Sequence, residues 1–231
     1  DWLVKPLRKI FPGFGGVDWA SLVGAFVFQL LWLLALYAIF GRGFTLSGGE
    51  PLMQHRFAAK LTAASRAMGI HTAIETNGHY GDRLSDDELA NLDLVLLGIK
   101  TWDPARHKAL TGMDVAPTLR FAERLAARRT PIWIRFVLVP GLTDDMADLA
   151  RTAAFAAGLG NVERVEVLPF HQMGRFKWER LGLDYTLTST EPPTTDLCEQ
   201  ACDVFFNEAA TTEIYTIADT LSLHDALLRQ H

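Results

Sequence analysis

An alternation of short apolar runs and amphipathic segments, extending from Gly43 to Asn207, constrains the fold more than any other feature of this sequence. Repeated strand–helix units with short loops form a parallel sheet, because each crossover helix lets the next strand run in the same direction. The expected strands lie at 43–47, 71–75, 94–99, 132–139 and 162–168. The expected helices lie at 55–68, 85–91, 116–128, 144–158 and 195–207. The sequence therefore predicts an α/β domain whose functional loops gather at the carboxyl edge of the sheet.

Two helices carry more specific expectations. In the helix at 55–68, the pattern predicts that Phe57, Leu61 and Ala64 face the core. The helix at 85–91 starts with Ser85-Asp-Asp-Glu, which fits a variant of the capping box.

A glycine-rich segment ends the first expected strand. In Ser47-Gly-Gly-Glu50 the glycines permit positive φ and a close approach of the backbone to a ligand. Glu50 supplies a charged acceptor for an ammonium or hydroxyl group. The alternative is a plain strand-to-helix turn that binds nothing.

Further motifs follow in order and carry a family resemblance. They are Glu-Thr-Asn-Gly at 75–78, Leu-Val-Leu-Leu-Gly-Ile-Lys at 94–100, His-Lys-Ala-Leu-Thr-Gly at 107–112, and the segments 133–145 and 167–174. From about Phe44 to about Phe206 the series resembles the pyruvate formate-lyase activating enzymes of the radical S-adenosylmethionine (SAM) superfamily. The resemblance implies an incomplete (β/α)6 partial barrel without its first unit. It also implies reductive cleavage of SAM and hydrogen abstraction from a partner glycyl radical enzyme such as pyruvate formate-lyase.

The same resemblance implies a set of residues that hold SAM. The Gly-Gly-Glu motif holds its amino group, the lysine that ends the third expected strand helps hold its carboxylate, and a histidine after the fifth contacts it. The cofactor-binding residues predicted in this way are Gly48, Gly49, Glu50, Glu75, Asn77, Ile99, Lys100, Arg135 and His171. For Arg135, a structural salt bridge within the barrel is the alternative. No catalytic residue and no metal ligand is predicted.

Two positions depart from the family motif. Gly98 stands where an aspartate is expected, which removes an oxygen ligand from the place where this branch holds a monovalent cation. Glu75 also replaces an aspartate and lengthens the side chain by one methylene. We expect the first change to be serious and the second to be tolerated.

The chain contains only two cysteines, Cys198 and Cys202. The family holds three irons of a [4Fe-4S] cluster with Cys-x3-Cys-x2-Cys, and two thiols cannot supply three ligands. Their spacing places both on one face of the helix at 195–207, where they are expected to be small buried residues; a partial metal site is the alternative. We therefore expect the chain to be catalytically incompetent.

The segment from Trp19 to Phe40 contains no charged residue. As a helix it would be roughly 33 Å long, enough to cross a hydrocarbon core of about 30 Å. Because Leu, Phe and Trp occur on every face, we expect a transmembrane helix at 19–40; a buried globular helix is the alternative. With Pro-Leu-Arg-Lys and Pro-Gly-Phe-Gly-Gly-Val-Asp before it, residues 1–42 resemble the YggT family of small bacterial membrane proteins.

These observations predict three parts of the chain: a YggT-like membrane segment at 1–42, an activating-enzyme domain lacking its cysteine segment at 43–207, and a tail at 208–231. The tail resembles the translation of a sequencing adapter; a final strand at 213–217 with a short helix after it is the structural alternative.

The first two parts imply different cellular locations. The positive charges of Lys5, Arg8 and Lys9 place the N-terminus in the cytoplasm and the domain after the span outside it, whereas the activating enzymes are cytoplasmic. Three hypotheses follow: an inactive activating enzyme, a membrane protein with a passive domain attached, or a chimera of joined genes without a native function. With a net charge of −5, nucleic acid is not expected as a partner.

Overall fold

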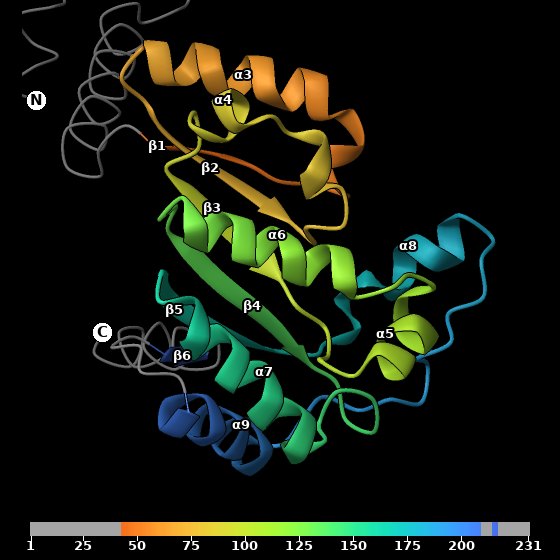
Figure 1. Ribbon diagram of the computed structural model, residues 1–231. Coiled ribbons are helices and arrows are strands. Elements are labelled where there is room, and N and C mark those ends of the chain that lie inside the picture. Colours follow the sequence, from red (N-terminus) through yellow and green to blue (C-terminus); the bar gives the residue numbers. More distant parts are fainter. Residues whose placement is uncertain (1–42, 209–213, 217–231) are drawn as a thin grey trace, which may run out of the picture. The chain divides into compact units, whose positions relative to one another are not determined.

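In the part of the chain that the structure describes, six strands in sequential order form one sheet. The computed structural model describes residues 43–208 and 214–216 (Figure 1). The strands follow the order β1-β2-β3-β4-β5-β6, and each pair from β2 to β6 is parallel. Their bounds are β1 (Gly43–Leu46), β2 (His71–Thr76), β3 (Leu94–Gly98), β4 (Ile132–Leu138), β5 (Val162–Pro169) and β6 (Ile214–Thr216). The predicted α/β fold with a parallel sheet is confirmed, and the first five strands begin at the predicted residues.

The helices connect successive strands as a parallel sheet requires. The long ones are α3 (His55–Ala67), α6 (Ala116–Ala127), α7 (Met146–Leu159) and α9 (Thr195–Glu208). The shorter ones are η1 (Pro51–Gln54), η2 (Gly81–Arg83), α4 (Asp86–Leu89), α5 (Pro104–Thr111), η3 (Gln172–Gly174) and α8 (Arg175–Arg180). The predicted capping box is present at Ser85 and Glu88 of α4. The sequence did not predict α5 and α8, because neither has an amphipathic pattern long enough to identify a helix.

The two faces of the sheet differ, and β4 shows this most clearly. Ile132, Ile134 and Phe136 are fully buried and belong to the hydrophobic core, together with side chains of α3, α6, α7 and α9. The intervening residues Trp133 and Arg135 are only partly buried. One face therefore packs under the helices, while the other can accept a ligand.

The buried face of α3 differs from the prediction. Ala58, Ala59 and Thr62 are buried, whereas Phe57 is 61% exposed. Ala64 is exposed as well, and Leu61 is only partly buried. The large apolar residues suggested one stripe, but the helix packs on the sheet through its small residues.

Two predictions concern parts of the chain outside the described residues. The transmembrane helix expected at 19–40 lies there, and among the residues that the structure describes no helix is long and apolar enough to cross a membrane. Most of the tail at 208–231 lies there too. The strand that was the structural alternative at 213–217 corresponds to β6, which pairs with β5 from Val165 to Val167.

Gly81 provides a test of core packing. A Cβ atom placed on Gly81 would lie 2.1 Å from the ring of Phe121, a residue of α6 that is only 3% exposed. Gly81→Ala should therefore destabilise the protein by about 1–3 kcal/mol, because the ring cannot move without disturbing the core. Thermal unfolding of the full chain measures the loss.

The matched control is Gly158→Ala in α7. Gly158 has no atom within 4 Å of its added Cβ. Alanine is favoured over glycine in a helix by about 0.5–1 kcal/mol, so this variant should unfold at a higher temperature than the parent. Equal effects of the two substitutions would contradict the packing described for Gly81.

Candidate functional site

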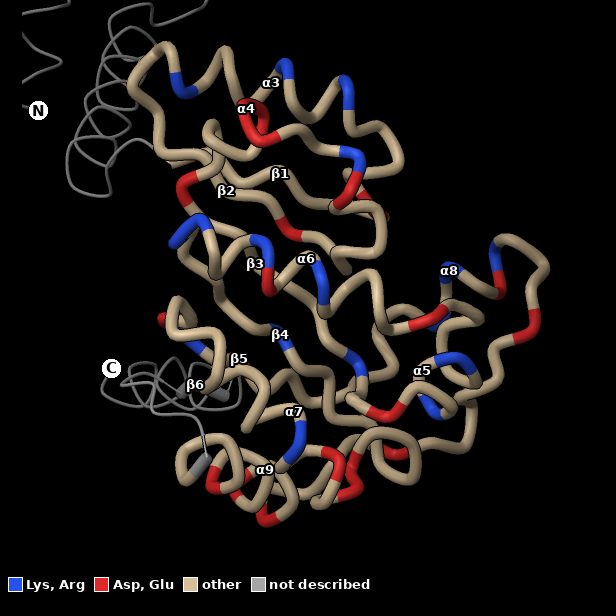
Figure 2. The backbone as a smooth tube through the Cα atoms, in the orientation of Figure 1, with Lys and Arg blue, Asp and Glu red and all other residues tan. Residues whose placement is uncertain are grey.

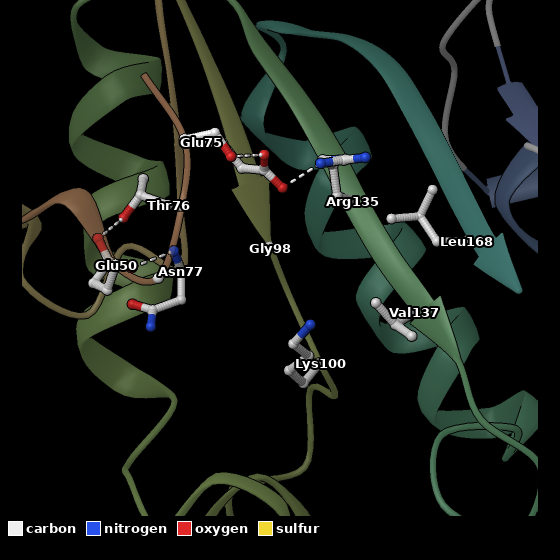
Figure 3. Close-up of a pocket in the computed structure, with 12 residues that line it drawn as sticks. Glu50, Glu75, Thr76, Asn77, Gly98, Lys100, Arg135, Val137 and Leu168 are labelled. Carbon is white, nitrogen blue, oxygen red and sulfur yellow. Dashed lines mark hydrogen bonds and ion pairs between the residues drawn. The ribbon is translucent and has the colours of Figure 1, made fainter. Parts of the chain in front are cut away.

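A pocket of about 340 Å³ lies at the carboxyl ends of the strands, on the face that the helices leave open (Figure 3). Its lining comes from the loop after β1, the ends of β2 to β5 and the residues that follow β2 and β3. The lining residues are Ser47, Gly48, Gly49, Glu50, Glu75, Thr76, Asn77, Gly98, Lys100, Arg135, Val137 and Leu168. Parallel α/β sheets bind their ligands at this edge.

The structure brings seven of the nine predicted cofactor-binding residues to this pocket. They are Gly48, Gly49, Glu50, Glu75, Asn77, Lys100 and Arg135. Ile99 is fully buried in the core, and His171 is exposed, with its Nδ1 accepting a hydrogen bond from the Met173 N–H at 3.3 Å. The sequence did not predict Val137 and Leu168 as lining residues. Val137 lies two residues after Arg135 and thus on the same face of β4, a periodicity that could have identified it.

Glu50 fastens the glycine-rich loop to the end of β2. Its Oε1 accepts hydrogen bonds from the Leu52 N–H at 2.9 Å and the Thr76 hydroxyl at 2.7 Å. Its Oε2 accepts one from the Asn77 N–H at 2.8 Å (Figure 3). Three internal donors therefore occupy the carboxylate that the sequence assigned to a ligand's ammonium group. The first role of Glu50 in this geometry is to position the loop.

The loop itself has the conformation that its glycines predict. Gly48 and Gly49 have φ values of 104° and 50°, in the region that side chains disfavour. No atom lies within 4 Å of a Cβ placed on either one, so the backbone, and not crowding, requires glycine. The backbone groups of this loop are thus exposed at the rim of the pocket.

Arg135 is engaged by protein carboxylates. Its Nη1 forms an ion pair with Glu75, and its Nε forms one with Glu166 at 3.0 Å. Glu75 also accepts a hydrogen bond from the Ser47 hydroxyl at 2.6 Å. The alternative of a structural salt bridge, which the sequence left open, describes this geometry.

Lys100 is placed differently from the other charged residues of the pocket. Within the described part of the chain it makes no hydrogen bond or salt bridge, and its side chain extends into the pocket (Figure 3). Burial lowers the pKa of the Lys100 amine; the nearby Arg135 guanidinium lowers it further, and Glu75 opposes the shift. An ammonium group in this position is poorly solvated, so it would gain from an anionic ligand.

The pocket contains no cysteine. Cys198 and Cys202 lie on α9, which packs against α7 and β5. In the described residues, no group of three or more His, Cys, Asp or Glu side chains could hold a metal ion.

Two family models match this chain. The model of the Radical SAM superfamily matches residues 29–153, which is more than half of the chain. The model described as CCB3/YggT matches residues 1–39.

Similar proteins include activating enzymes. The pyruvate formate-lyase-activating enzyme of Staphylococcus epidermidis is 42% identical over 167 residues, which cover 70% of this chain and 66% of that protein. That of Staphylococcus aureus strain USA300 is 40% identical with the same coverage. The chain thus spans 66% of the length of these curated relatives.

Solved structures share the fold at lower identity. A domain of a pyruvate-formate lyase-activating enzyme from Bacteroides vulgatus is 22% identical, with a TM-score of 0.62, covering 76% of this chain and 99% of that one. SuiB of Streptococcus suis bound to S-adenosylmethionine is 15% identical, with a TM-score of 0.56, covering 75% of this chain and 39% of SuiB. The family match, these relatives and the partial barrel agree, and this chain belongs to the radical SAM superfamily.

Proposed function

We propose that the pocket binds S-adenosylmethionine through the methionine end of the molecule. The observation that carries this proposal is the convergence of the glycine-rich loop and Lys100 on one cavity. Carbonyl oxygens of the loop suit an ammonium group, and Lys100, which has no ion pair among the described residues, suits a carboxylate. These two groups together distinguish an amino acid from a simple anion or cation.

The [4Fe-4S] cluster of the superfamily does not fit the residues present. Three thiolates are required, but the 231 residues hold two cysteines, and neither lines the pocket. We infer that this chain recognises SAM without supplying the electron that cleaves it. Hydrogen abstraction from a glycyl radical enzyme, the activity that the resemblance implies, therefore requires cluster ligands from elsewhere.

A glycyl radical enzyme such as pyruvate formate-lyase is the partner that this family membership favours. The charge distribution gives no reason to prefer nucleic acid. Figure 2 shows basic and acidic residues interspersed over the described elements, and the net charge of the chain is −5.

A second function is favoured by the match of residues 1–39 to CCB3/YggT. It assigns membrane association to the uncharged segment at 19–40, within a YggT-like part at 1–42 that precedes the radical SAM domain at 43–207. The hypothesis that the parts were joined from separate genes stays a prediction, which a single long read of the source DNA across codons 38–50 and 205–231 tests.

Calorimetry with the full chain tests SAM recognition. We expect no micromolar binding, because chelation of SAM to a cluster iron is absent and because Gly98 removes the carboxylate of the family motif. The loss of two interactions of about 1.5–3 kcal/mol each weakens the affinity by roughly two to four powers of ten. Lys100→Met should weaken SAM binding by a further factor of about 10, because the loss of one charged contact is worth at least about 1.4 kcal/mol.

Two controls separate this contact from a general loss of structure. Decarboxylated SAM lacks the carboxylate, so Lys100→Met should leave its affinity unchanged or improve it. His171→Ala lies outside the pocket and should bind SAM like the parent. Equal losses for both ligands in Lys100→Met would contradict the assignment of the carboxylate to Lys100.

Anaerobic reconstitution with iron and sulfide tests the cluster. We expect no stoichiometric cluster in the full chain, because four-iron clusters are held by cysteine thiolates that this chain lacks. A variant with both Cys198→Ser and Cys202→Ser should retain the same residual iron. About four irons per chain, lost in that variant, would show that the chain builds a cluster site after all.

Partitioning into lipid vesicles tests the second function. Leu31→Lys, near the centre of the uncharged segment, should cost about 2.5–3.5 kcal/mol on insertion scales and release the full chain from the membrane fraction. Leu31→Ala should remain bound. Equal partitioning of the parent and both variants would instead favour a buried globular helix.

A further inference from the structure

The ion pair at the floor of the pocket spans two strands. Glu75 lies on β2 and Arg135 on β4, with β3 between them. Neighbouring strands are about 4.8 Å apart, so the two backbones are separated by roughly 10 Å. Gly98 is the register partner of Arg135 on the intervening strand, and Glu75 pairs with Leu96. The two side chains therefore meet above β3, close to Gly98 (Figure 3).

Position 98 belongs to the pocket face of β3. Val95 and Leu97 are fully buried on the helix face, and the alternation of side chains along a strand places Gly98 on the opposite one. A Cβ on Gly98 would meet only the Thr76 carbonyl oxygen, at 3.7 Å. Glycine is thus not required by crowding at the Cβ. A longer side chain would enter the space in which Glu75 reaches Arg135.

Charge imposes a second condition on this position. Arg135 already pairs with both Glu75 and Glu166, and Glu75 is also bound by the Ser47 hydroxyl. A carboxylate at position 98 would face Arg135 directly across one strand spacing and compete with Glu75 for it. It would also lie two residues before Lys100 and could neutralise the one pocket charge, among the described residues, that makes neither a hydrogen bond nor an ion pair.

We propose that Glu75, Gly98 and Arg135 act as one positioning unit. Gly98 keeps the space above β3 clear, Glu75 crosses it to hold Arg135, and Lys100 is thereby left available for the anionic group of the ligand. The glutamate at 75 and the glycine at 98 compensate for one another, since the carboxylate that pairs with Arg135 comes from β2 instead of β3. Identification of that anion as the SAM carboxylate rests on the proposed function; the unit itself does not.

A double-mutant cycle on the full chain tests the compensation. Glu75→Asp should be too short to reach across β3 and should lower the melting temperature by about 2–6 °C. Gly98→Asp alone should also lower it, because three carboxylates then surround one guanidinium. The double variant should recover at least half of the Glu75→Asp loss, since Asp at 98 can pair with Arg135 from the adjacent strand.

Gly98→Ala is the matched control, because it adds a Cβ without charge. It should not rescue Glu75→Asp. Losses that simply add in the Glu75→Asp, Gly98→Asp double variant would overturn the proposal, as would an equal rescue by alanine. If Glu75→Asp does not fold, Glu75→Gln replaces it in the same cycle, with the same rescue expected from Gly98→Asp.

The reactivity of Lys100 gives a readout that packing alone would not move. Acetylation of Lys100 by acetic anhydride, followed by peptide mass spectrometry as a function of pH, reports the pKa of its amine. Gly98→Asp should raise this pKa and Gly98→Ala should leave it unchanged; no difference between the two would overturn the role assigned to Gly98. Neither the double-mutant cycle nor the acetylation of Lys100 uses SAM, so both experiments still test the positioning unit if SAM does not bind.

Discussion

The carboxylate of Glu50 ties the first loop of the barrel to the second strand, and the pocket depends on this tie. Loops at the edge of a sheet have few backbone partners of their own, and two glycines make this one costly to order. Glu50 accepts hydrogen bonds from the Thr76 hydroxyl and the Asn77 N–H, which lie 26 and 27 residues after it in the sequence. The end of β2 is fixed in turn by α6, where the Thr118 hydroxyl donates to the Asn77 carbonyl at 2.7 Å. The helix layer thus fixes the rim of the pocket through one carboxylate.

The charges of the pocket divide into groups that build it and one group left for a ligand. Glu50, Glu75 and Arg135 have protein partners at the distances given above. Lys100 has none in the described residues, and burial lowers the pKa of its amine. A lowered pKa means that the folded state disfavours the charged form, so this residue costs stability near neutral pH. Such a cost at a pocket is typical of residues selected for binding.

The sequence predicted the strands well because each of the five is a short segment with apolar or β-branched residues, bounded by turn residues. It also predicted the pocket edge, since the carboxyl ends of parallel strands must lie together. The prediction of which face of α3 points inward was wrong. Large residues such as Phe57 suggested one apolar stripe, but Ala58 and Ala59 are the buried residues.

The partners of the charged side chains in the site could not be predicted, because they depend on how neighbouring strands are aligned. Whether Arg135 binds a ligand or a neighbouring carboxylate depends on strand register, which a single sequence does not specify. The same register pairs Gly98 with Arg135, so that both departures from the family motif, at 75 and 98, lie beside one ion pair. His171 and Ile99 were predicted from motif position; neither lines the pocket, because His171 is exposed after β5 and Ile99 is fully buried in the core.

The proposed recognition of SAM by this pocket is tested by a titration followed by amide NMR. The N–H signals of Gly48, Gly49, Asn77 and Lys100 are predicted to shift together as SAM is added, with those of His171 and its neighbours unchanged. Shifts centred on the segment after β5, or no shifts at SAM concentrations up to about 10 mM, would contradict recognition of SAM by this pocket.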